Sequence, residues 1–140
     1  MIITIVGSSC FAKQMVEYRD LLIKLGHQVN LHEHYLAQAK GEMKDLIGRM
    51  TREHASVKKE YDYIRYHYKE ITESDAVLVL NFDKNGIKNY IGGNTLMEIG
   101  FAYVNYKKIF LLNPIPDMHY KDELEAMEPI IFDKNLSLIN

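Results

Sequence analysis

The strongest constraint on the fold is a set of short apolar runs that alternate with helical patterns. Ile2 to Val6 is an uninterrupted, largely β-branched run, and "AVLVLN" (76–81) is the most strand-like segment of the chain. Such runs are typical of strands that are buried on both faces of a parallel sheet. Further strands are expected at "QVNLHE" (28–33), "KIFLLN" (108–113) and, at an edge, "PIIF" (129–132).

Between these strands, apolar residues recur at spacings of three and four, which predicts helices. The expected helices span Phe11–Leu25, Leu36–Met50, one long stripe from Val57 to Ile71, Asn94–Tyr106 and Tyr120–Met127. The alternation predicts an α/β fold: a three-layer sandwich with a mainly parallel sheet, Rossmann-like or flavodoxin-like. A length of 140 residues predicts a single domain, 1–140.

Composition narrows the expected partners and compartment. A net charge of −2 gives no reason to expect a nucleic-acid polymer or an anionic membrane as partner. The chain has no apolar run of about 20 residues and no basic segment before its first apolar run, so we expect a cytoplasmic protein. Cys10 is the sole cysteine, which excludes an internal disulfide and a cysteine-built metal site.

Two loops are expected at the carboxyl edge of the sheet, where ligands bind in folds of this class. One is Gly7-Ser8-Ser9 after the first strand, and the other is 83–93 before the helix at Asn94. "GSSC" is neither G-x-G-x-x-G nor a Walker A loop. It still offers a glycine, two hydroxyls and the free amides of a helix start, which suit a phosphate. A plain strand-to-helix turn capped by Ser8 or Ser9 explains the same residues.

Glu98 is a single carboxylate among the apolar residues of the helix that is expected to begin at Asn94. Its neighbours Met97 and Ile99 are apolar, and Gly100 is small enough for tight packing on a sheet. A carboxylate near a helix N-terminus gains from the helix dipole, so a purely structural role and a functional one both stand.

Histidines and basic residues gather in the middle of the chain. His32 and His34 would share one face of the expected second strand, a conceivable metal pair, but a third ligand is not evident and we expect no metal site. A basic cluster marks the expected helix junction: Arg49, Arg52, Lys58 and Lys59. Such a cluster is either a solvated face or a lid that faces a phosphate.

Three short elements of the sequence form one pattern: Ser74-Asp75 before a strand, then Thr95, Glu98, Gly100 and Ala102 on a helix, then Lys107-Lys108 before the next strand. With these residues, the segment from Asp75 to Leu112 resembles the nucleoside 2-deoxyribosyltransferase-like family, which also contains deoxynucleoside 5′-monophosphate N-glycosidases. The family pattern is a strand that opens with Ala-Asp, a helix written (G)-T-x-x-E-x-G-x-A, and Gly-Lys before an apolar strand.

The resemblance implies that Glu98 attacks the anomeric carbon of a nucleoside sugar and holds a glycosyl ester. It places Asp75, Gly92, Gly93 and Asn94 at the substrate. The chain departs from the family twice. Gly93 stands where deoxyribosyltransferases carry an aspartate, and His67 lies in the region of the aspartate that assists the departing base, with Asp62 the nearest helix aspartate.

The sequence therefore predicts a protein that binds a nucleotide or nucleoside, without a cofactor, and that cleaves or transfers at the N-glycosidic bond. The catalytic candidates are Glu98 and His67. A non-catalytic nucleotide-binding or sensor module is the alternative, and a flavin-binding flavodoxin-like protein is a third hypothesis. We also expect a homo-oligomer, most simply a dimer, with Tyr103, Tyr106 and the segment from Met118 to Met127 as contact surface.

Overall fold

The computed structural model describes residues 1–42, 44, 48–49, 52–60 and 62–140. The described strands are β1 (Ile2–Gly7), β2 (Gln28–Asn30), β3 (Ala76–Leu80), β4 (Lys108–Leu111) and β5 (Ile130–Ile131). The described α-helices are α1 (Ala12–Lys24), α2 (Glu33–Ala39), α4 (His54–Glu60), α5 (Tyr63–Thr72), α6 (Gly93–Val104) and α7 (Lys121–Ala126). Short 3-10 turns lie at Ser9–Phe11 and Leu136–Leu138.

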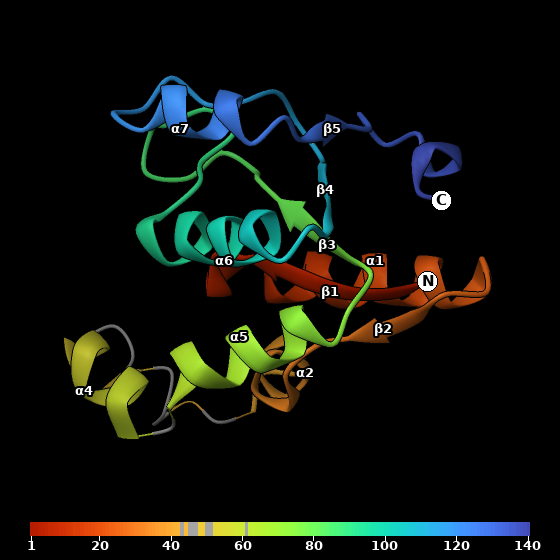
Figure 1. Ribbon diagram of the computed structural model, residues 1–140. Helices are drawn as coiled ribbons and strands as arrows, with labels where there is room; N and C mark the ends of the chain where they lie inside the picture. Colours follow the sequence, from red (N-terminus) through yellow and green to blue (C-terminus); the bar gives the residue numbers. More distant parts are fainter. Residues whose placement is uncertain (43, 45–47, 50–51, 61) are drawn as a thin grey trace.

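The five strands form one parallel sheet in the order β2-β1-β3-β4-β5 (Figure 1). β1 and β3 are neighbours, with Gly7 opposite Leu80 at their carboxyl ends. β5 is a short edge strand that pairs with β4. The predicted α/β fold with a parallel sheet is confirmed, because each apolar run is long enough to pair and each helix returns the chain to the same end of the sheet.

Each face of the sheet has its own apolar core. On one face, Met15 and Leu22 of α1 pack against Ile3, Ile5 and neighbouring strand residues. On the other face, Ile71 of α5 and Ile99 of α6 pack against Val77, Val79 and Ile109. Alternate strand residues point to opposite faces, so helices must cover both of them, and the result is the predicted three-layer sandwich.

The second strand is shorter than predicted. β2 pairs with β1 only from Gln28 to Asn30. The chain then turns, and His32 becomes the N-cap of α2 through a hydrogen bond of 3.0 Å from the His34 amide to its Nδ1. The predicted strand face bearing His32 and His34 is therefore wrong. The predicted helix over 36–50 is described as α2 up to Ala39, and its positions 43, 45–47 and 50 lie outside the described residues.

The long stripe from Val57 to Ile71 is two helices rather than one. Asp62 precedes α5 with φ 50°, a left-handed conformation that interrupts the helical path between α4 and α5. On α5 the buried residues are Tyr63, His67 and Ile71, while Ile64 and Tyr68 are 42% and 44% exposed. The prediction that Ile64 and Tyr68 belong to the buried stripe is wrong.

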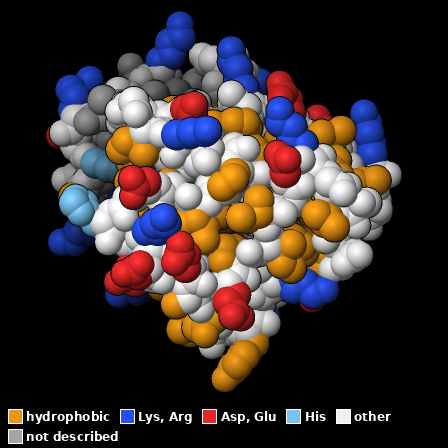
Figure 2. Space-filling view, turned by 90° about the horizontal axis from the view of Figure 1, so that it is seen from above, with side chains coloured by type: hydrophobic (Ala, Val, Ile, Leu, Met, Phe, Trp, Pro, Cys, Tyr) orange, Lys and Arg blue, Asp and Glu red, His pale blue; other side chains and the backbone are white. Residues whose placement is uncertain are grey.

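The surface mixes charged and apolar side chains. Figure 2 shows one face on which Lys and Arg side chains lie between Asp and Glu side chains, with apolar groups between them. Within the described part of the chain, no helix has the length and apolar character needed to cross a bilayer.

Candidate nucleotide-binding site

The first wall of the candidate site is the loop that follows β1. Gly7 has φ +154°, and a Cβ atom there would lie 2.9 Å from the carbonyl oxygen of Leu80 on β3. Only glycine fits this close approach without a shift of the backbone. Ser8 and Ser9 follow and line the pocket together with Cys10, so the predicted loop does lie at the carboxyl edge of the sheet.

The loop that follows β3 brings a lysine to Ser8. Residues 84–87 form a tight turn in which the amides and carbonyls of Lys84 and Ile87 bond to each other at 2.9 and 3.0 Å. Asn85 and Gly86 both have positive φ, at 53° and 74°, as a type I′ turn requires. The Nζ of Lys84 donates to the Oγ of Ser8 at 2.7 Å and lies 5.2 Å from the ring centre of Tyr90.

The N-terminus of α6 opens into the same pocket. The helix begins at Gly93, one residue before the expected start at Asn94, and Gly92 is its N-cap. The first-turn amides have no partner within the helix, and a Cβ on Gly93 would meet no atom within 4 Å. An open, uncapped helix start with a positive dipole end is suited to an anion.

Glu98 lies one turn further along α6 and is 3% exposed. Its Oε1 accepts a hydrogen bond of 2.8 Å from the Nδ2 of Asn94. Asn94 and Thr95 line the pocket, but Glu98 is not among the lining residues. Burial raises the pKa of Glu98 from 4.5 to about 8, against the opposing effects of the Lys58 charge and the Asn94 hydrogen bond. A carboxylate near a helix N-terminus gains from the helix dipole, but at Glu98 the effect of desolvation on the pKa outweighs both stabilising contacts.

The far wall consists of imidazole and phenol rings from α2 and α5: His32, His34, Tyr35, Tyr63 and His67. The ring centres of His32 and His34 are 4.3 Å apart, and His34 Nδ1 is hydrogen-bonded to the Tyr63 hydroxyl. Tyr35 and His67 are stacked at 6.4 Å. Flat rings of this kind offer stacking surface to a planar ligand.

His67 is buried in this wall, with 6% of its surface exposed. Burial, with help from the charges of His32 and Lys58, lowers its pKa to about 4. His67 is therefore neutral at physiological pH and is a poor general acid there. Its buried Nδ1 has no hydrogen-bond partner among the described residues.

Helix α4 adds two basic side chains, His54 and Lys58. Val57 is fully buried and packs with Tyr63, which holds α4 against α5. Of the predicted basic cluster, Lys58 lines the pocket, whereas Arg49 pairs with Glu53 at 3.2 Å and Arg52 and Lys59 are exposed. The hypothesis of a lid that faces a ligand thus applies to Lys58 alone among these four residues.

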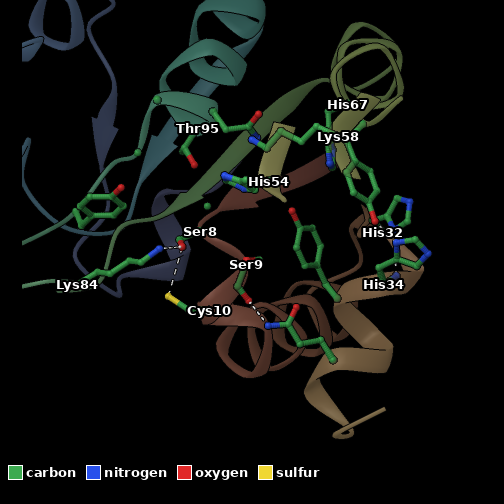
Figure 3. Close-up of a pocket in the computed structure, with 18 residues that line it drawn as sticks. Ser8, Ser9, Cys10, His32, His34, His54, Lys58, His67, Lys84 and Thr95 are labelled. Carbon is green, nitrogen blue, oxygen red and sulfur yellow. Dashed lines mark hydrogen bonds between the residues drawn. The ribbon is translucent and has the colours of Figure 1, made fainter. Parts of the chain in front are cut away.

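Together these walls enclose a pocket of about 700 Å³. In Figure 3, Ser8, Ser9 and Cys10 lie across the pocket from Lys58 and His67, with His54 between them. The described lining includes two lysines and four histidines and contains no Asp or Glu. Such a lining attracts anions. Within the described residues, no three His, Cys, Asp or Glu side chains are grouped as metal ligands.

Most of the predicted site residues meet at this pocket: Gly7, Ser8, Ser9, His67, Gly92, Gly93 and Asn94. Asp75 does not, because it lies at the amino end of β3, where its Oδ2 accepts a hydrogen bond of 2.7 Å from the Ile2 amide. Asp62 is exposed and pairs with Arg65 at 3.3 Å, so it does not supply an acid opposite Glu98.

The sequence interpretation missed Lys84 and Tyr35. The "KNGI" turn signal was available for Lys84, but Tyr35 reaches the pocket only through packing between helices. Comparison with known proteins adds no further information, since no protein-family model, curated protein or solved structure matches this chain.

Proposed function

We propose that the protein binds a nucleoside or 2′-deoxynucleoside 5′-monophosphate and cleaves its N-glycosidic bond, with Glu98 as the nucleophile. The observation that carries this proposal is the division of one pocket into two chemically different ends. The Ser8–Lys84 pair and the open start of α6 form a polar, cationic end, while Tyr35 and Tyr63 belong to an aromatic wall.

The cationic end suits a 5′-phosphate. Lys84, the hydroxyls of Ser8 and Ser9 and the first amides of α6 are all donors, and charge-assisted bonds from such groups contribute about 1.5–3 kcal/mol each. Gly93 leaves this end free of the negative charge that an aspartate would bring. The aromatic wall suits the base, which would lie against its rings.

In the proposed reaction, a Glu98 carboxylate oxygen bonds to the anomeric carbon and the bond from that carbon to the base nitrogen breaks. The base leaves with the electron pair of that bond. Water then cleaves the glycosyl ester, so that over the cycle one water supplies the sugar hydroxyl and the proton of the released base. Since Glu98 is 3% exposed, side chains between it and the sugar must move before attack.

One observation favours the alternative of a non-catalytic nucleotide-binding module. With a pKa of about 8, Glu98 is mostly protonated at pH 7. His67, with a pKa of about 4, is unprotonated at that pH and has no proton to donate to the departing base. The catalytic proposal consequently requires turnover that rises with pH toward about 8.

Binding and chemistry are tested separately. Calorimetric titration with a nucleoside and its 5′-monophosphate should give at least a tenfold preference for the monophosphate, which corresponds to about 1.4 kcal/mol. Gly93→Asp should remove that preference by like-charge repulsion. Gly93→Asn, with nearly the same shape and no charge, should retain it. Equal affinities in the wild-type protein would contradict the phosphate assignment.

Release of free base from pooled nucleotides, followed by chromatography, tests the chemistry. Glu98→Gln should bind the monophosphate but lose turnover by orders of magnitude, since it keeps the shape and lacks the nucleophile. Monophosphate binding without base release by the wild-type protein would establish the non-catalytic alternative.

A further inference from the structure

The Nδ1 of His67 is a buried polar atom without a partner among the described residues. The side chain lies on α5 and is 6% exposed, and no described residue forms a hydrogen bond with its Nδ1. Buried side-chain nitrogens are almost always hydrogen-bonded, because an unpaired one costs free energy in the folded state. A site that is built to hydrogen-bond a ligand leaves such an atom unpaired until the ligand binds.

Aromatic rings hold this imidazole in place. Four ring centres lie between 5.4 and 6.4 Å from its own, those of His32, Tyr35, Tyr63 and Tyr66. The His34 amide donates to the Nδ1 of His32 at 3.0 Å, and the Tyr63 hydroxyl is hydrogen-bonded to His34 as well. The ring wall thus fixes His67 by packing and gives its Nδ1 no hydrogen bond.

His67 lines the pocket opposite the proposed phosphate end. In Figure 3 it lies on the same side as Lys58, across the pocket from Ser8 and Ser9. A pocket of about 700 Å³ lies within the size range of small-molecule sites. A nucleotide whose phosphate binds at Ser8 would therefore extend its base toward the ring wall that contains His67.

The imidazole of His67 suits the edge of a nucleobase. Burial lowers its pKa to about 4, so the ring is neutral at physiological pH. A neutral imidazole carries one N–H donor and one acceptor nitrogen. Base edges carry both donors and acceptors, and enzymes that take up a single base read it by such hydrogen bonds together with ring stacking. The unpaired Nδ1 and the rings around it offer both interactions.

We propose that His67 is a specificity-determining residue: its buried Nδ1 forms a hydrogen bond with the edge of the base in the bound nucleotide. The inference rests on the proposed function for the identity of the ligand. It gives His67 a role in recognition in place of the catalytic role that the sequence predicts.

The experiment is ¹⁵N NMR of protein labelled at the histidine side chains. The His67 signals are identified by their absence from His67→Asn. Titration with AMP, GMP, CMP, UMP and their 2′-deoxy counterparts should move the Nδ1 signal of His67 with at least one of them, because that nitrogen gains a hydrogen bond. Ribose 5-phosphate has the sugar and the phosphate but no base. It is the matched control ligand and should leave the signal in place.

Calorimetric titration of variants gives a second measurement. His67→Leu, which is similar in volume and has no polar atom, should bind the same nucleotide at least tenfold more weakly, which corresponds to about 1.4 kcal/mol. Its affinity for ribose 5-phosphate should be unchanged. His67→Asn keeps a polar group close to the position of Nδ1 and should recover part of the affinity. His119→Leu, at an exposed site, is the control and should alter neither affinity. If His67→Leu does not fold, the NMR titration of the wild-type protein decides.

A nucleotide that binds without moving the Nδ1 signal would overturn the inference and retain the proposed function. An equal movement with ribose 5-phosphate would also overturn the inference. Unphosphorylated nucleosides that move the signal and bind as tightly as their monophosphates would retain the inference and reject the phosphate assignment. No binding of any nucleoside or nucleotide would reject both.

Discussion

Replacing Glu98 by Gln should make the protein more stable, and the gain should grow with pH. The glutamine amide keeps the size of the side chain and an oxygen that can accept the Asn94 hydrogen bond. It resembles the protonated carboxyl, which is the form that burial favours. The variant therefore removes only the cost of ionising a carboxyl that is 3% exposed.

The magnitude follows from the pKa of Glu98, which is 4.5 in the unfolded chain and about 8 in the folded protein. Between these values the folded state retains a proton that the unfolded state has lost, so the free energy of unfolding falls as pH rises. Each pH unit corresponds to about 1.4 kcal/mol, which gives a loss of about 5 kcal/mol across the whole interval. Above pH 8 the loss is complete, and below pH 4.5 it is absent.

Urea unfolding of both proteins at several pH values from 5 to 9 measures this difference. The histidines titrate alike in both proteins, so their contributions cancel in the comparison. Glu123→Gln, at an exposed site, is the control and should show no growing gain. A constant difference between Glu98→Gln and wild type over this pH range would refute the claim that Glu98 is buried in its protonated form.

Three further predictions concern other parts of the molecule. Gly7→Ala should destabilise the fold by about 1–3 kcal/mol in thermal unfolding, because its Cβ would lie 2.9 Å from the Leu80 carbonyl oxygen; an unchanged midpoint would contradict this. Burial lowers the pKa of His67 from 6.5 to about 4 in the folded protein. The free energy of unfolding should therefore fall by about 3 kcal/mol as pH drops through that interval, because the unfolded state takes up a proton there and the folded state does not. His67→Asn should flatten this acid limb of the urea-unfolding profile, whereas exposed His119→Asn should not. Sedimentation should show a dimer that Tyr106→Asp, at a 97% exposed site, converts to monomer; a monomeric wild-type protein would remove the interface hypothesis.

The sheet was predictable because its central strands correspond to short, continuous apolar runs in the sequence. A run such as Ile2 to Val6 has no amphipathic period and needs burial on both faces, which only a central parallel strand provides here. The boundary of β2 was not predictable from such a run. The strand ends at Asn30, and His32 caps α2. The cap depends on a single hydrogen bond, which the spacing of apolar residues does not reveal.

The helical stripe over 57–71 shows a different limit. A left-handed residue at Asp62 precedes α5 and separates it from α4, and Ile64 and Tyr68 lie on the exposed side of α5 although their spacing matches the expected period. Spacing reports neighbours on one continuous helix and carries no information about a break.

The candidate site was predictable on the side that belongs to the sheet. The loop at Gly7 and the start of α6 follow directly from strand order, because the carboxyl ends of parallel strands meet at one edge. On the opposite wall, His67 was expected as a catalytic candidate and Lys58 as a member of a basic cluster, but Tyr35 was not expected, because it reaches the pocket through packing of α2. The raised pKa of Glu98 was not predictable from its place on the helix, because the burial that causes it is a tertiary property.

The adjacency of β1 and β3 has a consequence for how this pocket can diversify. Gly7 lies opposite Leu80, so the loops after both strands leave the sheet from neighbouring points whose separation the strand pairing fixes at about 5 Å. Mutations there disturb the pairing itself. Of the side chains on α2, α4 and α5 that line the pocket, exposed ones such as His54 belong to none of the apolar cores. Mutational tolerance should therefore be uneven across the cavity, low beside Gly7 and at the buried rings of Tyr63 and His67, and new ligand preferences should arise first at the exposed positions of α4.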